Sequence, residues 1–446
     1  MKHFKIIIIF LCLFWYGCSS QLDVTPKDAI PQNSLSTSDI AQLRTGVYST
    51  MEDLLFSFYF DFDIRAENLK GGPGFYLVDP VSMTASNATI TSLWQTAYKG
   101  LSKVNFLIPQ VDTLGAGATA ALLSYKGEAL YFRALIYYNL VTRWGGVPIV
   151  LRNTSEPIQR SAEADVWTQI KSDLAASRKL IGSPAGYFYV SDMAVKALMA
   201  RVCLATGDNA NAILYADSLI TSGKYTLAAD SAAYSSMFVS ASTSKEIIFG
   251  LANNSTSNPH VFYSQVNDTK ATWPYSPSDS AFKSLYSDAV SPVSKSGDKR
   301  KPAVFGSDPT RVIKYPNGKT NQQLVASNTP NQTPIIVSRI AEMYLIKAEA
   351  QGAAAGAATL APYFTARYKT APATATVAGL SELQYQDLIL NERFREFYCE
   401  GYKWYDIKRT KRTDLLTSWG GRDYLLYYPI PQTERDLAGY TQNDGY

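Results

Sequence analysis

Residues 392–409 restrict the fold of this chain more than any other segment, because they combine acidic, basic and aromatic side chains in one helical run. Glu392, Glu396 and Glu400 lie four positions apart, so on a helix they share one face. A row of carboxylates on a helix is usually a charge ladder. The run therefore predicts a buried, ion-paired packing helix and not a catalytic pair. Its apolar surface comes from Phe394, Phe397, Tyr398, Trp404, Tyr405 and Ile407.

Helical periodicity dominates most of the chain. Several of the expected helices form antiparallel pairs in which small residues such as Ala197 and Ala200 alternate with large ones. Small side chains let neighbouring backbones approach closely, as stacked helix pairs require. The chain is therefore predicted to be mainly α, with a tetratricopeptide-like body of helix pairs. The expected helices are 37–56, 88–111, 118–143, 162–181, 190–206, 208–222, 334–353 and 384–410.

Two long irregular segments interrupt the helices, residues 57–87 and 224–333. The second is an insert rich in Ser, Asn, Pro and aromatic residues, between body segments at about 38–222 and 334–410. One strand is expected within it, at 246–251. Long irregular segments in compact proteins are usually functional or disordered, and the aromatics favour function. A third loop is expected at 354–382, and an extended end near 424–429.

The N-terminus has the pattern of a secretory signal. Residues 1–17 contain Lys2, Lys5 and an apolar run of eleven residues at 6–16, which is too short to span a bilayer at about 20 residues. Gly17 precedes Cys18, which predicts lipoprotein processing with acylation of Cys18, although Trp15 is unusual for such a site. Ordinary secretion is the alternative. A lipid-anchored tether at 18–37 and one domain at 38–446 would follow.

The balance of charges argues against nucleic acid as a partner. The chain carries 42 basic and 38 acidic side chains, without a basic stripe. His260 is the one histidine that remains after removal of the signal, and no nucleophile motif accompanies it, so we expect no catalytic residue. We interpret it as a loop histidine near ligand or solvent. Cys203 and Cys399 lie in apolar helical patterns, which favours buried free thiols over a bridge.

Two other kinds of chemistry stay open. Glu396 and Glu400 could lie at a distance suited to glycoside hydrolysis, which would make the chain a secreted hydrolase. Asp61 and Asp63 could help to bind calcium, although two acids without a complete loop are a weak signal. Otherwise no metal or cofactor is expected.

Phrases along the chain resemble the SusD/RagB family of outer-membrane nutrient-uptake lipoproteins. The run at 392–409 is similar to the family's C-terminal signature, with Lys403 in place of the usual arginine. Four phrases in the right order, which together span nearly the whole mature chain, make the resemblance specific. The other three are 131–148, with its Trp-Gly-Gly-Val-Pro turn, 339–350, and the ending at 428–431 with 443–446.

The resemblance implies a surface-exposed lipoprotein of the outer membrane. Such a protein would bind oligosaccharides and cap a TonB-dependent, SusC-like barrel as a hinged lid. It would be a binding protein and not an enzyme. A peptide-binding lid of the RagB kind is the alternative within the family.

Loop aromatics are the expected ligand contacts, because helical scaffolds use inserted loops for recognition. Sugar rings stack their C–H faces on aromatic planes. Within the insert, a proline between two rings, at Trp273 and Tyr275, would hold both at low entropic cost. Arg65 and Asn68 would supply hydrogen bonds to hydroxyl groups. The complete predicted set is Trp273, Tyr275, Phe75, Tyr76, Tyr263, Arg65 and Asn68.

Overall fold

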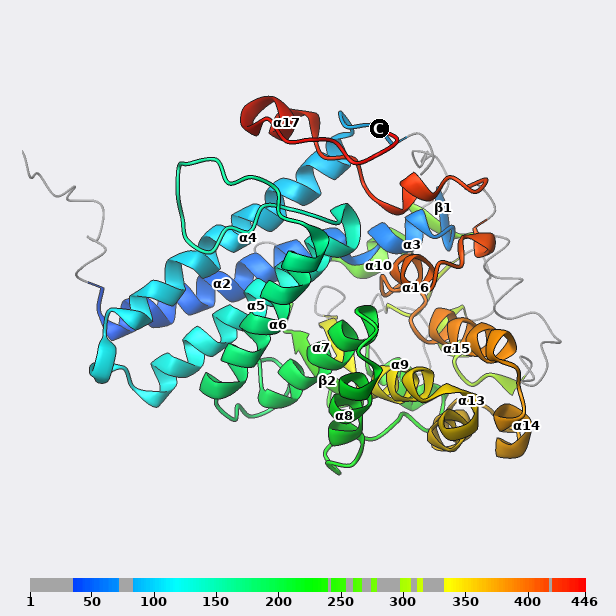
Figure 1. Ribbon diagram of the computed structural model, residues 1–446. Helices are drawn as coiled ribbons and strands as arrows, with labels where there is room; N and C mark the ends of the chain where they lie inside the picture. Colours follow the sequence, from blue (N-terminus) through cyan, green and yellow to red (C-terminus); the bar gives the residue numbers. More distant parts are fainter. Residues whose placement is uncertain are drawn as a thin grey trace, which may run out of the picture.

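The computed structural model describes residues 35–71, 83–239, 242–253, 260–266, 274–278, 297–305, 311–315, 333–416 and 419–446. These residues form a mainly helical protein (Figure 1). The predicted helical body is confirmed. Its first helices are α2 (Thr37–Tyr59), α4 (Ala88–Asp112), α5 (Ala120–Trp144), α6 (Glu163–Leu180), α7 (Asp192–Ala205) and α8 (Asn209–Ile220).

Consecutive helices of the body pack against each other, α4 on α5, α5 on α6 and α7 on α8. Their starts follow from the sequence, because a polar side chain accepts a hydrogen bond from the first turn of each of four of them. Asn87 caps α4, Thr119 caps α5, Ser191 caps α7 and Asp208 caps α8. The antiparallel pairs predicted from periodicity are therefore present.

The segment expected to be one helix at 334–353 contains a strand and a longer helix. Residues Ile335–Arg339 form β4, which pairs with β2 (Ile247–Leu251) and is buried along its whole length. β-Branched residues at 335–337 favour a strand once a partner strand is available. Helix α13 (Ile340–Arg367) then continues through the alanine-rich segment expected to be a loop, with a kink at Gly352, where φ is 72°.

The C-terminal part also departs from expectation. The range 384–410 is divided into α15 (Glu382–Glu396) and α16 (Lys403–Thr410). A short helix, α14 (Thr374–Ala378), lies in the segment expected to be a loop. The end expected to be extended near 424–429 begins as a 3₁₀ turn, η7 (Asp423–Leu426). The remaining elements here are η6 (Thr413–Leu415) and α17 (Gln432–Ala438).

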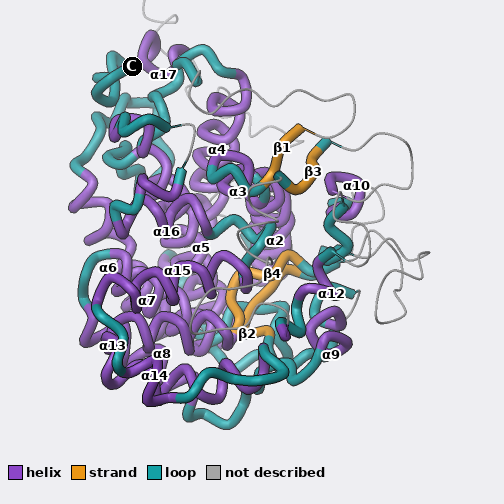
Figure 2. The backbone as a smooth tube through the Cα atoms, turned by 90° about the vertical axis from the view of Figure 1, so that its right-hand side faces the viewer, coloured by secondary structure: helices purple, strands orange, loops and turns teal. Residues whose placement is uncertain are grey.

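Two small antiparallel sheets lie beside the helical body (Figure 2). One pairs β2 with β4, which confirms the strand predicted at 246–251, and the other pairs β1 (Leu69–Gly71) with β3 (Tyr275–Pro277). The remaining short elements are α3 (Asp61–Arg65), η4 (Gly115–Gly117) between α4 and α5, α9 (Ser231–Ser236), α10 (Phe262–Val266) and α12 (Lys301–Val304).

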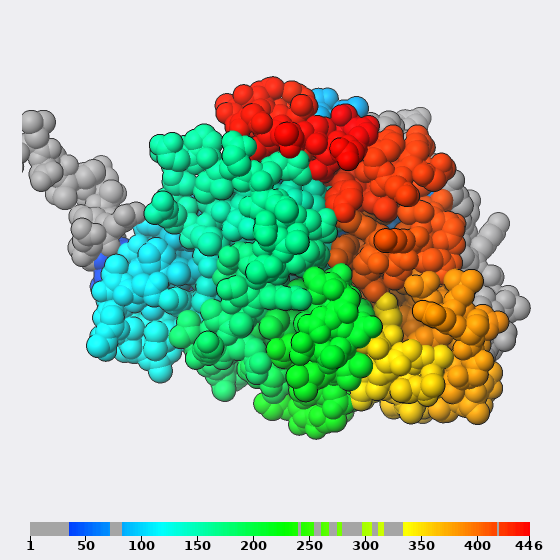
Figure 3. All heavy atoms as spheres, in the orientation of Figure 1, coloured from blue at the N-terminus to red at the C-terminus, as the bar shows by residue number. Residues whose placement is uncertain are grey.

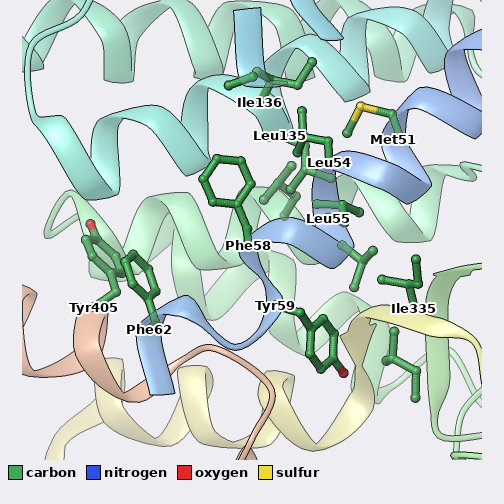
Figure 4. Close-up of a cluster of buried hydrophobic side chains, with 14 of the residues drawn as sticks. Met51, Leu54, Leu55, Phe58, Tyr59, Phe62, Leu135, Ile136, Ile335 and Tyr405 are labelled. Atoms are coloured by element: carbon green, nitrogen blue, oxygen red, sulfur yellow. The ribbon is translucent and has the colours of Figure 1, made fainter. Parts of the chain in front are cut away.

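The largest buried apolar cluster extends from α2 to the C-terminal segment. Its centre brings Leu54 and Phe58 of α2 against Leu135 of α5 and Ile335 of β4 (Figure 4). Trp94, Trp144 and Trp404 are at most 2% exposed and pack in this core.

The C-terminal segment, red in Figure 3, lies against the teal part of the surface that follows α5. There the Trp144 indole donates to the Pro429 carbonyl at 3.1 Å, and Asn443 Nδ2 donates to the Trp144 carbonyl at 3.0 Å. The Trp-Gly-Gly-Val-Pro turn of the phrase at 131–148 and the chain's ending thus contact each other through Trp144.

Candidate functional site

The three glutamates of the C-terminal signature lie at the centre of a buried network of charges. Glu396 accepts from Arg339 Nη1 at 2.6 Å, from Arg367 Nε at 2.8 Å and from Arg300 Nη1 at 2.9 Å. These side chains are at most 1% exposed. Burial opposes ionisation, but the three guanidinium groups hold the pKa of Glu396 well below its ordinary value. The prediction of a buried, ion-paired signature is confirmed.

This geometry excludes Glu396 as a catalytic carboxyl. A glycosidase needs an open cleft and an acid whose pKa is raised, whereas both oxygens of Glu396 are occupied by guanidinium groups. Glu400 is likewise engaged, because it accepts from Arg339 Nη2 at 2.8 Å and pairs with Lys314. The hydrolase alternative built on these two residues is therefore wrong.

The helix break at 397–402 aims Glu400 back into the network. Cys399 and Gly401 adopt the left-handed conformation, with φ of 60° and 76°. Their backbone N–H groups donate to the Asp63 carboxylate at 3.1 and 2.7 Å, and Asn68 Nδ2 donates to it at 2.7 Å. Burial raises the pKa of Asp63 to about 6, against the effect of these donors. Asp63 thus fastens α3 to the signature.

Replacing Gly401 by alanine tests this turn. A Cβ atom there would lie 2.8 Å from the Tyr59 carbonyl oxygen, and the backbone would need a left-handed alanine. We expect Gly401→Ala to lower the free energy of unfolding by about 2 kcal/mol or more, measured by urea denaturation. Gly223→Ala is the matched control, because Gly223 has φ of 68° and no atom within 4 Å of its Cβ position. Equal losses in both variants would contradict the close approach.

Arg65 lies in the interior and not on a ligand-facing loop. It is 0% exposed, and its guanidinium carbon lies 4.2 Å from the ring centroid of Tyr428, 4.9 Å from that of Trp404 and 5.0 Å from that of Trp419. Its Nη2 donates to the carbonyl of Leu425 at 2.5 Å. The prediction that Arg65 binds hydroxyl groups of a ligand is therefore wrong, because its guanidinium group is buried among three aromatic rings.

The same correction applies to Asn68, and the two acids suggested for calcium, Asp61 and Asp63, accept hydrogen bonds from protein groups. Asn68 is 0% exposed, donates to Asp63, and its backbone carbonyl accepts from the Tyr398 hydroxyl at 2.8 Å. Asp61 accepts from Arg143 Nε at 2.8 Å and from the Tyr428 hydroxyl at 2.7 Å. Asp61 and Asp63 are thus occupied by different donors. Among the residues given above as described, no three Asp, Glu, His or Cys side chains form a metal-binding group.

The β1–β3 ribbon joins the two irregular regions that were predicted to face the ligand. Its register places Leu69 opposite Pro277 and Gly71 opposite Tyr275. The Ser278 amide extends the pairing by donating to the Asn68 carbonyl at 2.9 Å. Segments about 200 residues apart in the chain therefore meet at one hydrogen-bonded junction.

Two of the predicted aromatic contacts lie at this junction. Tyr275 is half-buried, and its ring centroid lies 6.1 Å from that of Phe60. Burial raises the pKa of Tyr275, with a smaller effect from Asp61. Tyr263 is half-buried on α10, which lies against β3. The structure therefore brings Tyr275 and Tyr263 to adjacent elements. Trp273, Phe75, Tyr76 and Cys18 lie outside the described residues.

Two basic residues of the insert, Arg300 and Lys314, bind the insert to the C-terminal signature, and the sequence interpretation missed them. Arg300 pairs with Asp298 at 2.7 Å as well as with Glu392 at 3.1 Å. Lys314 donates to the Tyr398 carbonyl at 2.9 Å. Isolated basic residues in a Ser- and Asn-rich segment opposite an acidic helix are the one signal that could have indicated these anchors.

The histidine and the cysteines also belong to the fold. His260 is 9% exposed, stacks on Phe56 with ring centroids 4.6 Å apart, and has Nε2 3.2 Å from Asp53 Oδ1. Burial lowers the pKa of His260, and Asp53 opposes this shift. Cys203 and Cys399 are buried free thiols, as predicted.

Among the described helices, none is both long and apolar enough to cross a membrane.

Comparison with solved structures places the fold among SusD-like proteins. A SusD superfamily protein from Bacteroides thetaiotaomicron superimposes with a TM-score of 0.75 at 21% identity, over 92% of this chain and 100% of that one. A laminarin-binding SusD-like protein superimposes with a TM-score of 0.71 at 18% identity, over 92% and 99%.

Sequence comparison agrees with the fold. A SusD-like protein of Formosa agariphila is 25% identical over 92% of this chain and 93% of its own length. The family described as "Starch-binding associating with outer membrane" matches residues 21–204, and the "SusD family" matches residues 309–421. With the buried signature, these matches show that the chain belongs to the SusD/RagB family.

Proposed function

We propose that this protein is an outer-membrane surface lipoprotein that binds oligosaccharides and delivers them to a TonB-dependent, SusC-like barrel. Membership of the SusD/RagB family supports the general role, and the likeness to a laminarin-binding protein of the same fold supports a carbohydrate ligand. Binding without catalysis agrees with the buried, fully paired signature carboxylates.

The observation that carries the proposal is the β1–β3 ribbon. It joins two aromatic-rich segments at one junction. The hydrogen bonds of Asp63 to the signature fix the neighbouring helix α3 in place. Half-buried Tyr275 there offers a ring beside polar backbone, the combination that a sugar face and its hydroxyl groups require. The proposed ligand contacts are Tyr275, Tyr263, Trp273, Phe75 and Tyr76, the last three on the strength of sequence alone.

Alanine substitution at the junction tests the ligand site. We expect Tyr275→Ala to weaken binding of the preferred oligosaccharide about tenfold, because a lost stacking partner costs about 1.4 kcal/mol. Calorimetric titration against glycan and oligopeptide panels measures this, and Trp273→Ala is expected to act in the same direction. Tyr189→Ala, at a tyrosine that is 43% exposed on the helical body, is the control.

The panel also distinguishes the alternatives. Binding of oligopeptides in place of glycans would favour a lid of the RagB kind. Unchanged glycan affinity in both Tyr275→Ala and Trp273→Ala would contradict the aromatic site. Incorporation of labelled fatty acid that is lost in Cys18→Ala tests the anchor, and co-purification with a barrel protein tests the partner.

A further inference from the structure

A polar cavity that shares no lining residue with the β1–β3 ribbon lies where the start of α6 and the end of α7 meet α16. It has a volume of about 350 Å³, which is within the range of sites for small ligands. In Figure 3 the green and orange-red parts of the surface adjoin along this region. Its lining includes Glu163, Tyr405, Lys408, Arg409, Thr413 and Tyr427.

Lys408 is the unusual member of this lining. It is 9% exposed, its Nζ donates to the Thr142 carbonyl at 3.0 Å, and it lies 3.7 Å from the ring centroid of Tyr427. No carboxylate among the described residues lies within salt-bridge distance of it. The other buried lysine of the described part, Lys314, pairs with Glu400. A buried ammonium normally has such a counter-charge, because burial without one is costly.

The remaining charged groups of the lining decide which ligand fits. Arg409 is satisfied by Glu349 and Asp406. Glu163 accepts from the Tyr427 hydroxyl at 2.9 Å and from the Trp167 indole at 3.3 Å. These two donors are neutral, so Glu163 keeps its charge, but it lies beyond salt-bridge distance of Lys408. Lys408 and exposed Lys411 therefore remain to attract an anion, against two acids of the lining, Glu163 and exposed Asp423.

We propose that this cavity binds the carboxylate of a small ligand of monosaccharide or amino-acid size, with Lys408 as its counter-charge. The rings of Tyr405 and Tyr427 would contact the body of the ligand, and the Thr413 side chain would contact its polar groups. An acidic sugar and the C-terminus of a peptide share this chemistry. The site has no residue in common with the β1–β3 ribbon, so it stands or falls independently of the oligosaccharide site.

The protonation of Lys408 makes the proposal measurable. Burial lowers the pKa of Lys408 to about 7, Glu163 raises it, and Arg65 and Arg143 lower it further. A bound carboxylate favours the charged amine, so binding above pH 7 must take up a proton. We expect the dissociation constant to rise about tenfold between pH 6 and pH 8. The titratable groups around Lys408 are Glu163 on α6, Arg143 on α5, Arg65 on α3, Tyr405 and Arg409 on α16, Lys411 just after it, Asp423 on η7 and Tyr427 just after that turn.

Titration calorimetry with sodium glucuronate, with N-acetylalanine and with uncharged glucose tests the site. We expect heat from one or both carboxylates and none from glucose at pH 6. At pH 8, buffers of different ionisation enthalpy should reveal uptake of close to one proton for each carboxylate bound. Preference for glucuronate would identify a sugar acid as the source, and preference for N-acetylalanine a peptide end. Absence of carboxylate binding at pH 6, or binding without proton uptake at pH 8, would overturn the proposal.

Variants distinguish a ligand-binding role of Lys408 from a role in packing alone. We expect Lys408→Met to abolish carboxylate binding, and Asp423→Asn to strengthen it several-fold because an exposed negative charge at the rim is removed. Lys179→Met is the control, since Lys179 is exposed on α6 and does not line the cavity. If Lys408→Met does not fold, the Asp423→Asn affinity and the buffer dependence decide. Unchanged affinity in a folded Lys408→Met protein would refute the assignment.

Discussion

Glu396→Gln is expected to lower the free energy of unfolding by about 3–5 kcal/mol, because it leaves buried guanidinium groups without their shared carboxylate. Glu396 is 0% exposed and contacts Arg300, Arg339 and Arg367. Urea denaturation of the purified protein measures the loss. Glu382→Gln is the matched control, since Glu382 is exposed at the start of the same helix, α15. A loss below about 1 kcal/mol, as expected for a surface ion pair, would contradict the role of the network.

The pH dependence of stability gives a second measurement on the same variant. The pKa of Glu396 is lowered in the folded protein, so below its ordinary value of 4.5 the unfolded chain binds more protons than the folded one. The stability that Glu396 contributes is therefore fully present above about pH 4.5 and is lost as the pH falls further. We expect Glu396→Gln to show a shallower acid dependence than the parent protein.

Arg65→Ala is expected to cost about 3–5 kcal/mol of folding free energy, as large-to-small changes in packed cores do. The substitution empties the space between Tyr428, Trp404 and Trp419, and it removes the donor to the Leu425 carbonyl. It also removes cation–π contacts of about 0.5–2 kcal/mol each. Thermal and urea unfolding measure the effect.

This experiment also discriminates between two roles for Arg65. Arg152→Ala, at an exposed arginine of the helical body, should leave stability within about 0.5 kcal/mol of the parent. If Arg65 instead contacted the oligosaccharide, Arg65→Ala would weaken glycan binding and leave stability unchanged. That result would restore the sequence-based interpretation and contradict the buried cage.

Local sequence signals were sufficient for the helices of the body. Periodicity located α2, α4, α5, α6, α7 and α8, and side-chain caps such as Asn87 and Asp208 explain where two of them begin. Local signals were insufficient where contacts with a distant segment determine the secondary structure. Residues 335–339 form a strand because β2, nearly 90 residues earlier, offers hydrogen bonds.

The residues of the candidate site also divide into those that local sequence could predict and those that depend on distant contacts. The signature glutamates could be predicted to be paired, but not their partners, because Arg300, Arg339 and Arg367 lie between 29 and 96 residues earlier in the chain. Arg65 and Asn68 were predicted to be exposed because an irregular segment was equated with a loop. In the structure they border α3, whose burial depends on contacts with the C-terminal signature.

The β1–β3 ribbon has a consequence for how such a protein can diversify. Its three-residue strands join the chain just before position 72 to the chain just after position 274, on a base tied to the most heavily paired part of the core. The segments that extend beyond these two paired strands can change in length at a modest entropic cost, because the entropy of loop closure depends only weakly on loop length. Under the proposed function, exchanging the short segments that follow β1 and precede β3 for those of a relative should change the ligand preference and leave the stability of the helical body intact.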